Sequence, residues 1–150
     1  MLAPDLDQTK FVAGYDFVNN DAHANDDNSH GTHVAGTIAQ STNNSIGVAG
    51  IAYSATLMPV KVLNKRGSGT YTAIANGIRF AADHGADVIN LSLGGPYPSQ
   101  ILEDALADAH SKNVTIVAAA GNDGTGTVSY PAAYDAYVIA VGATRVDKTL

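Results

Sequence analysis

The fold class is decided by residues 87–120, which begin with Asp87-Val88-Ile89-Asn90-Leu91-Ser92-Leu93 and end with Val114-Thr115-Ile116-Val117-Ala118-Ala119-Ala120. Both runs are short, apolar and rich in branched side chains, which is typical of strands buried on both faces. Between them, residues 99–112 show the spacing of an amphipathic helix, with apolar side chains at Ile101, Leu102, Ala105, Leu106 and Ala109. A strand, a helix and a second strand in this order predict a parallel pair joined by a crossover helix.

The same alternation extends outward along the chain. Further strands are predicted at residues 11–17, 56–63 and 136–143, and a further helix at residues 70–84. Gly85 and Asn113 stand where helices would end, because both residue types tolerate left-handed backbone angles. The predicted fold class is therefore α/β, a mostly parallel doubly wound sheet with helices on both faces. Ligand sites are expected at the carboxyl ends of the strands, where loops rich in Gly and Asn follow.

The composition limits the classes of protein that fit this chain. It has 150 residues, of which 45% are hydrophobic and 15% charged, enough apolar material for the core of one domain. A net charge of -6 offers no broad attraction to nucleic acid or to an anionic membrane surface. The absence of Cys excludes disulfides and thiolate chemistry. No apolar run approaches the length of about 18 residues that a membrane span requires, and residues 1–10 lack the features of a signal peptide.

One string carries chemistry more clearly than the rest, namely Asn28-Ser29-His30-Gly31-Thr32-His33-Val34-Ala35-Gly36-Thr37. It predicts a polar turn that enters a helix with His30 in the first turn. A single His at such a place is more often a capping or core residue than a catalytic base. His23, His30 and His33 could also form a transition-metal cluster, although no His-Glu pair of the zincin type and no Cys accompanies them.

Two further strings lie at the ends of predicted strands. Val117-Ala118-Ala119-Ala120-Gly121-Asn122 runs into a Gly-rich loop, where the amide of Asn122 can bond an oxyanion; an ordinary turn residue is the alternative. Val88-Ile89-Asn90-Leu91-Ser92-Leu93-Gly94-Gly95 is a buried strand followed by a bend. Together with the His string, and in the same order along nearly all of the chain, these segments resemble the subtilisin-like serine proteases, the subtilases.

The resemblance implies a secreted serine endopeptidase that binds an extended polypeptide as its substrate. It assigns His30 as the catalytic base and Asn122 as the oxyanion-hole donor. The substrate main chain would lie between two edges of the protein, formed by Leu63, Gly67, Ser68, Gly69, Ser92, Leu93 and Gly94. Ala119 and Gly121 would leave room for a substrate side chain. A propeptide, or the remaining parts of the domain, would be the other partners.

The acidic N-terminal region has a candidate role as a binding region for structural calcium. Residues 1–30 contain six Asp residues and Lys10 as the only Lys or Arg. The stronger candidate site is made by Asp5, the side-chain oxygen of Asn44 and the backbone carbonyls of Ile46 and Val48, and the resemblance to the thermitase-like branch implies another. This second site would use Asp16, Asn19, Asp21 and Asn25, which present hard oxygen ligands at short spacing. Asn19 stands where this branch can carry Asp, and a solvated polar loop is the alternative for the second set.

The chain departs from the family pattern at both ends. The family's catalytic Asp precedes the Pro4-Asp5-Leu6 segment and its Ser lies in a Gly-Thr-Ser-Met string, and neither motif is present. We therefore expect residues 1–150 to be a partial peptidase domain, the middle part without its Asp and Ser motifs, and to be inactive alone. A noncatalytic peptide-binding or calcium-binding remnant of a subtilase is the alternative. Any export segment would lie outside this sequence.

Overall fold

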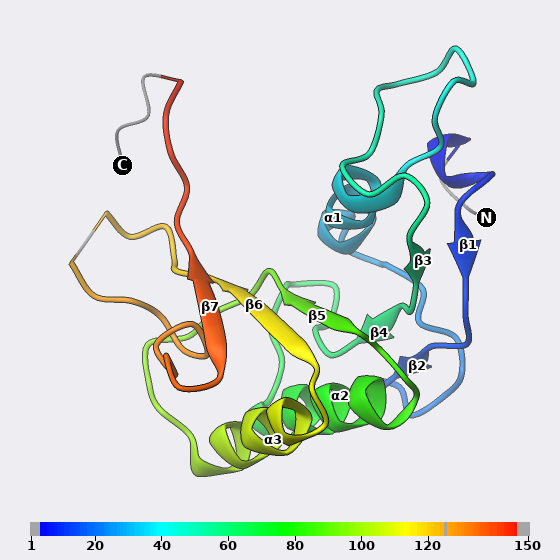
Figure 1. Cartoon of the computed structure of the whole chain (residues 1–150). Coiled ribbons are helices and arrows are strands. Elements are labelled where there is room, and N and C mark those ends of the chain that lie inside the picture. Colours follow the sequence, from blue (N-terminus) through cyan, green and yellow to red (C-terminus); the bar gives the residue numbers. More distant parts are fainter. Residues whose placement is uncertain (1–3, 125, 147–150) are drawn as a thin grey trace. The chain divides into compact units, whose positions relative to one another are not determined.

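The computed structural model describes residues 4–124 and 126–146, which fall into two compact units divided after Ala73. The described part contains parallel strand pairs and three α-helices (Figure 1), which confirms the predicted α/β class. None of the helices in this part is long and apolar enough to span a bilayer.

The first unit is built on two short pairs of parallel strands. These are β1 (Lys10–Phe11) with β3 (Thr56–Leu57), and β2 (Tyr15–Asp16) with β4 (Val60–Lys61). The short 3-10 helix η1 (Pro4–Leu6) precedes the strands, and α1 (His30–Ala39) follows β2. Helix α1 lies against both η1 and β3, and Ala39 in its last turn is completely buried. The C-terminal end of α1 is thus anchored in the unit, while His30 begins the helix.

The strand pairs of this unit are separated by an interruption that the hydrophobic pattern did not reveal. The expectation of one continuous strand in each of residues 11–17 and 56–63 is wrong, because each segment splits in two. Across the interruption, three residues of the first segment face two of the second, as in a β-bulge. Pro59 has no N–H to donate, and its carbonyl oxygen would overlap any Cβ at position 14. Only glycine fits at position 14.

The second unit is a parallel sheet in the order β5 (Val88–Leu91), β6 (Thr115–Ala119) and β7 (Val138–Val141). Helix α2 (Tyr71–Asp83) leads into it and α3 (Gln100–Ser111) connects β5 to β6. All five elements lie within the segments that the sequence pattern predicted. Gly85 and Asn113 have φ angles of 81° and 61°, which confirms the left-handed positions expected after the two helices.

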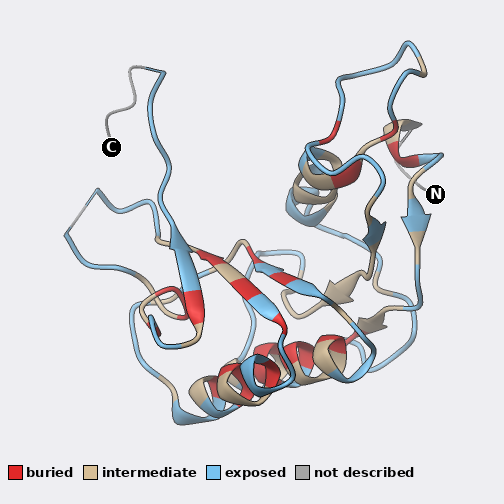
Figure 2. Cartoon of the chain, in the orientation of Figure 1, coloured by how far each residue is buried: buried red, intermediate tan, exposed pale blue. Residues whose placement is uncertain are grey.

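The core of the second unit lies between the sheet and its two helices (Figures 1 and 2). Ile78 of α2, Leu102 and Leu106 of α3, and Ile116 of β6 are each no more than 1% exposed. The opposite face of the sheet presents branched apolar side chains, because Val88, Ile139 and Val141 are more than half exposed. Within this unit, one face of the sheet is therefore covered and the other carries uncovered apolar surface.

Candidate active site

The predicted base, His30, is the first residue of α1, and its side chain is exposed rather than packed in the core. Ser29 occupies the position just before the helix, where a side-chain oxygen normally accepts a bond from the first turn. Its backbone is left-handed, with φ of 79°, and within the described chain its side chain makes no such bond. The exposed backbone N–H groups of the first turn must therefore find their acceptor elsewhere.

That acceptor is the carboxylate of Asp26. Its Oδ2 accepts the backbone N–H of Thr32 at 2.8 Å and the Thr32 hydroxyl at 2.7 Å. Its Oδ1 accepts the N–H groups of Asn28 and Ser29, each at 2.9 Å. Partial burial raises the pKa of Asp26, but the bonds from the Thr32 hydroxyl and from these backbone groups lower it to about 2. Asp26 is therefore ionised at neutral pH, next to the positive end of the helix dipole.

The ammonium group of Lys61 in β4 lies beside the acidic segment that precedes α1. Its Nζ lies 2.7 Å from Asp27 Oδ2 and 3.8 Å from Asp16 Oδ2, and it donates to the carbonyl of Asn25 at 3.0 Å. The Lys61 side chain is only 10% exposed. This lysine therefore ties the segment before α1 to the strand pair β2 and β4.

Asp16, the central residue of the second predicted calcium set, is 1% exposed. Its carboxylate accepts the N–H of Val18 at 2.7 Å, and both the N–H and the side-chain amide of Asn19 at 2.9 Å. Burial raises the pKa of Asp16, but the bonds from Asn19 and Val18 and the charge of Lys61 outweigh it, so the net shift is downward. The oxygens of Asp16 already have protein donors.

The other members of that set are also engaged. Asp21 accepts the N–H of His23 at 2.7 Å. The side-chain amide of Asn19 donates to Asp16, and the carbonyl of Asn25 accepts a hydrogen bond from Lys61. A calcium ion would have to compete with these donors and with the ammonium group. The arrangement of the second set therefore gives little support for a bound cation.

The first predicted calcium set is arranged differently. Asp5 Oδ1 accepts the side-chain N–H of Asn44 at 2.8 Å, whereas Asp5 Oδ2 is buried and has no hydrogen-bond partner among the described residues. The Asn44 oxygen accepts the N–H of Ile46 at 3.2 Å, so it would face a cation only after the amide turned. The carbonyl of Val48 accepts the side-chain amide of Gln40. A buried carboxylate oxygen without a donor is the feature that a bound cation would satisfy.

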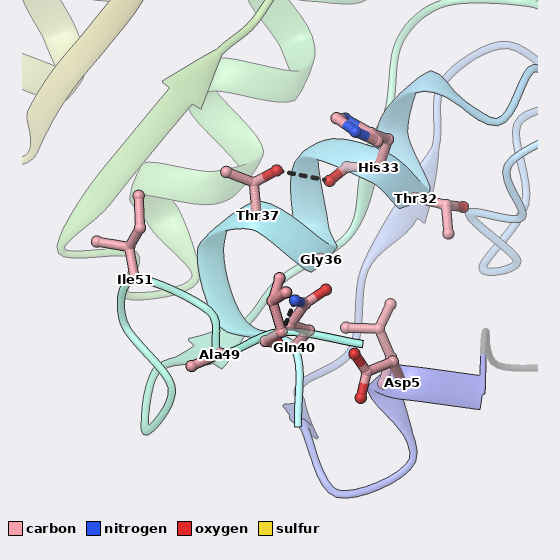
Figure 3. A pocket seen from close by; sticks show the side chains of 10 residues that line it. Asp5, Thr32, His33, Gly36, Thr37, Gln40, Ala49 and Ile51 are labelled. Atoms are coloured by element: carbon pink, nitrogen blue, oxygen red, sulfur yellow. Dashed lines mark hydrogen bonds between the residues drawn. The ribbon is translucent and has the colours of Figure 1, made fainter. Parts of the chain in front are cut away.

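The surroundings of Asp5 form a cavity of about 320 Å³ against α1. Figure 3 shows Asp5 on one side of it and His33, Gly36 and Thr37 on the helix. In residues 4–124 and 126–146, no three His, Cys, Asp or Glu side chains lie together in a group that could hold a metal ion. The three histidines His23, His30 and His33 therefore form no cluster there, and a cation beside Asp5 would depend on amide and carbonyl oxygens.

In the second unit, the structure brings four predicted residues together. Asn122, Gly121, Ala119 and Ser92 line one cavity of about 240 Å³, at the carboxyl ends of β5 and β6. Gly121 has a φ of 114°, and a Cβ there would lie 2.6 Å from Ser129 Oγ, so the bend before Asn122 requires glycine. Asn122 is exposed, and its amide is accessible for donation.

Leu93 and Gly94 lie beside this cavity rather than in its wall. Gly94 approaches Ser129 so closely that an added Cβ would be 3.0 Å from the serine Cβ. The next residue, Gly95, exchanges two backbone hydrogen bonds with Tyr130, at 2.8 and 2.9 Å. The bend that follows β5 is thereby held against the segment around residue 130.

In the first unit, the predicted substrate loop ends in an exposed turn at Gly67, Ser68 and Gly69, while Leu63 is half-buried. Asn64 holds the turn, because its N–H donates to the Ser68 carbonyl at 2.9 Å and its side-chain oxygen accepts backbone N–H groups. The side chain of Asn28 donates to the carbonyl of Lys65 at 2.9 Å. This bond joins the predicted substrate loop to the segment that precedes His30.

The pattern of the sequence did not single out Asp26, Asn28, Asn64 or Lys61. Helix caps are sought immediately before a helix, whereas Asp26 lies four residues before the first residue of α1. The partners of Asn28 and Lys61 lie 37 and 36 residues away in the sequence. The one available signal was the cluster of Asp and Asn residues before His30, which is typical of side chains that bind local backbone N–H groups.

Comparison with known proteins gives one consistent result. The model of the subtilase family matches residues 2–150. Thermitase from Thermoactinomyces vulgaris is 51% identical over 141 residues, which cover 94% of this chain and 50% of thermitase. Subtilisin DY from Bacillus licheniformis is 49% identical over 143 residues, which cover 93% of this chain and 52% of that protein.

A solved structure matches as well. The structure of sphericase agrees with a TM-score of 0.87 at 39% identity, covering 94% of this chain and 49% of the sphericase chain. The chain described here thus spans about half the length of the curated relatives it matches.

Proposed function

The chain belongs to the subtilase family, and from this premise we propose that it is part of a serine endopeptidase that hydrolyses extended polypeptides. In this proposal, His30 takes the proton of an attacking serine hydroxyl and later returns it to the leaving amine. The observation that carries the proposal is the position of His30, exposed at the first residue of α1 within the family match. A packed core histidine could not exchange protons with a substrate in this way.

Asn122 is the proposed donor to the oxyanion that forms at the substrate carbonyl. Its side chain is exposed beside a cavity of about 240 Å³ that could take a substrate side chain. A bond from this amide strengthens as the carbonyl oxygen becomes negative, so it stabilises the transition state more than the substrate. Gly67–Gly69 and Ser92–Gly94 each offer backbone for pairing with an extended peptide.

The nucleophile and the carboxylate of the proposed triad are not in the sequence given, which holds no Gly-Thr-Ser-Met string. A base without a nucleophile forms no acyl-enzyme. We therefore expect the 150-residue chain alone to leave a chromogenic peptide uncleaved. Turnover that a serine-directed inhibitor abolishes would contradict this expectation.

A chimera tests the assigned roles. Residues 2–150 replace the matching segment of thermitase, which supplies the rest of a subtilase domain. We expect the folded chimera to cleave the peptide and His30→Ala to lower its kcat at least about 10⁴-fold. The control is His23→Gln, which replaces an exposed histidine of the same segment and should change kcat little. Asn122→Leu should lower kcat by about 10² to 10³, the loss measured for such a donor in a subtilisin. A His30→Ala chimera with full activity would contradict the assignment.

The noncatalytic alternative predicts a different outcome. A folded chimera that binds the peptide but never cleaves it, although thermitase itself does under the same conditions, would favour a peptide-binding remnant. Circular dichroism of the chimera separates this outcome from a failure to fold.

Calcium is proposed as a structural ion at the Asp5 set alone. The buried Asp5 Oδ2 that lacks a donor among the described residues supports this site. Asp5, Asn44 and the carbonyls of Ile46 and Val48 would hold the ion, which would join η1 to the loop at residues 42–48. When bound, calcium would supply charge neutralisation and cross-linking rather than chemistry.

Secretion and a propeptide partner are proposed from the family resemblance. Fractionation of the source cells tests the location: the protein in the culture medium would support secretion, and the protein confined to the cytoplasm would contradict it.

A further inference from the structure

The N-terminus of α1 is organised around one carboxylate that is not part of the helix. His30 lies between Ser29 and Thr32, and the backbone N–H groups of both residues bind Asp26, at 2.9 and 2.8 Å. Thr32 adds a second bond through its hydroxyl, at 2.7 Å. The backbone on either side of His30 is thus held by the same side chain. Because Ser29 makes no cap bond of its own in the described chain, Asp26 replaces the usual cap.

Asp26 is in turn held in place by Lys61. The ammonium group binds the residues on either side of Asp26, namely the carbonyl of Asn25 at 3.0 Å and the carboxylate of Asp27 at 2.7 Å. Lys61 belongs to β4, which pairs with β2, and its side chain is 10% exposed. Lys61 therefore ties residues 25 and 27 to the strand pair, and Asp26, which lies between them, binds the first turn that carries His30.

The two ends of α1 are secured independently. At the C-terminal end, Ala39 is completely buried, and Gly50 packs so closely on the backbone of Ala39 and Gln40 that a Cβ would lie 2.6 Å from the Gln40 nitrogen. Loss of the Asp26 bonds would leave these contacts intact. It would loosen the first turn, where helices fray, without unfolding the helix.

We propose that Asp26 is a positioning residue for His30: its carboxylate orders the first turn of α1 and so places the imidazole for proton transfer. The inference rests on the proposed function, in which His30 is the general base. A base displaced by a fraction of an ångström binds substrate as before but transfers its proton less well. The signature is therefore a loss in kcat at constant KM.

Kinetics of the thermitase chimera that carries residues 2–150 test the proposal. We expect Asp26→Ala to lower kcat about 10-fold while KM stays within about 2-fold. Thr32→Val keeps the backbone bond but loses the hydroxyl bond, and should lower kcat about 3-fold. Thr32→Ser keeps both the backbone bond and the hydroxyl bond, and its kcat should equal that of the unaltered protein. The matched control is Asp21→Asn, which alters an exposed carboxylate that also accepts the N–H two residues ahead but, among the described residues, accepts no hydrogen bond from α1.

Hydrogen exchange gives a second measurement that does not depend on catalysis. Asp26→Ala should raise the exchange rate of the Ser29 and Thr32 amides at least about 10-fold and leave Ala39 unchanged, because only the first turn loosens. Should Asp26→Ala unfold the protein, Thr32→Val and Thr32→Ser provide the same comparison with a smaller change.

The outcomes separate the inference from the function beneath it. A folded chimera that carries the unaltered segment but has no peptidase activity refutes the proposed function, while exchange at Thr32 still reports whether Asp26 orders the turn. Unchanged exchange in Asp26→Ala overturns the inference. So does a kcat in Asp26→Ala equal to that of the Asp21→Asn control, or a rise in KM with kcat constant.

Discussion

Asp5 and Asp16 both lie in Asn-containing, acidic surroundings of the first unit, yet their carboxylates are satisfied in opposite ways. Asp16 is 1% exposed, and it receives hydrogen bonds from Val18 and Asn19 and the charge of Lys61. Asp5 receives one bond, from Asn44, and its other oxygen is buried with no donor in the described part of the chain. One region therefore contains its own counter-charge and donors, and the other lacks them.

This contrast shows that a cluster of acidic residues does not by itself indicate a metal site. What matters is whether the oxygens already have donors and a counter-charge, because a cation must compete with both. Beside Asp16, the positive charge of Lys61 is always present. Beside Asp5, the missing donor leaves room for an ion from solution. Four measurements test this contrast, in order of decreasing effect.

The largest effect is expected from removing the satisfied carboxylate. Asp16→Ala leaves the N–H groups of Val18 and Asn19 without their acceptor and takes one carboxylate from the nearly buried Lys61. We expect a loss of about 3 kcal/mol in the free energy of unfolding. Urea denaturation followed by circular dichroism measures it. A loss below about 1 kcal/mol would mean that these bonds contribute little beyond those to water.

The next effect is stabilisation by added calcium. A ligand at about 100 times its Kd stabilises the folded state by about 2.7 kcal/mol, which raises the Tm. Thermal denaturation with calcium, and with excess chelator, measures this shift. Asp5→Asn should abolish the shift, since the variant lacks the anionic oxygen that the ion would bind. A shift of equal size in Asp5→Asn would place the ion elsewhere.

A smaller effect is expected on acidification. The pKa of Asp26 is lowered from 3.8 to about 2, so its contribution to stability is present above about pH 4 and is lost as the pH falls toward 2. Because the side chain is exposed, this contribution is about 1 kcal/mol rather than the value for a buried group. Urea unfolding at pH 5 and pH 2.5 should show the difference between wild type and Asp26→Asn shrinking to less than half. If the difference in the free energy of unfolding between wild type and Asp26→Asn did not depend on pH, the charge of Asp26 would not be the source of this stability.

The smallest effect is expected at Asp21, which is exposed and accepts one bond, from the N–H of His23. Asp21→Asn should change the free energy of unfolding by less than about 0.5 kcal/mol, with or without calcium. Differential scanning calorimetry in both conditions measures it. A calcium-dependent loss in this variant would restore the second predicted site and contradict the role given to Lys61.

The second unit was predictable from the sequence because its signals are local. The strands β5, β6 and β7 are continuous apolar runs, and α2 and α3 show regular helical spacing and end before Gly85 and Asn113. In the first unit, the break in each strand follows from the close approach of Gly14 to Pro59. These residues are far apart in sequence, so no local pattern indicates the break.

For the candidate site, the motifs predicted His30, Asn122 and the loops around them, and the family match confirms the resemblance from which these predictions come. The residues that hold His30 in place were not identified. Asp26 binds the first turn of α1 at a place where Ser29 has a left-handed backbone and makes no side-chain cap bond in the described chain. That geometry is a property of the folded loop rather than of residue types.

The sequence by itself determined the α/β class, the order of elements in residues 74–146 and the subtilase family, because periodicity and short motifs depend on neighbouring residues. Only the tertiary structure decided which carboxylates have donors. Asn44 reaches Asp5 across 39 residues, and Lys61 reaches the carbonyl of Asn25 across 36. The electrostatic character of an acidic residue is set by such distant partners, which come together only when the chain folds.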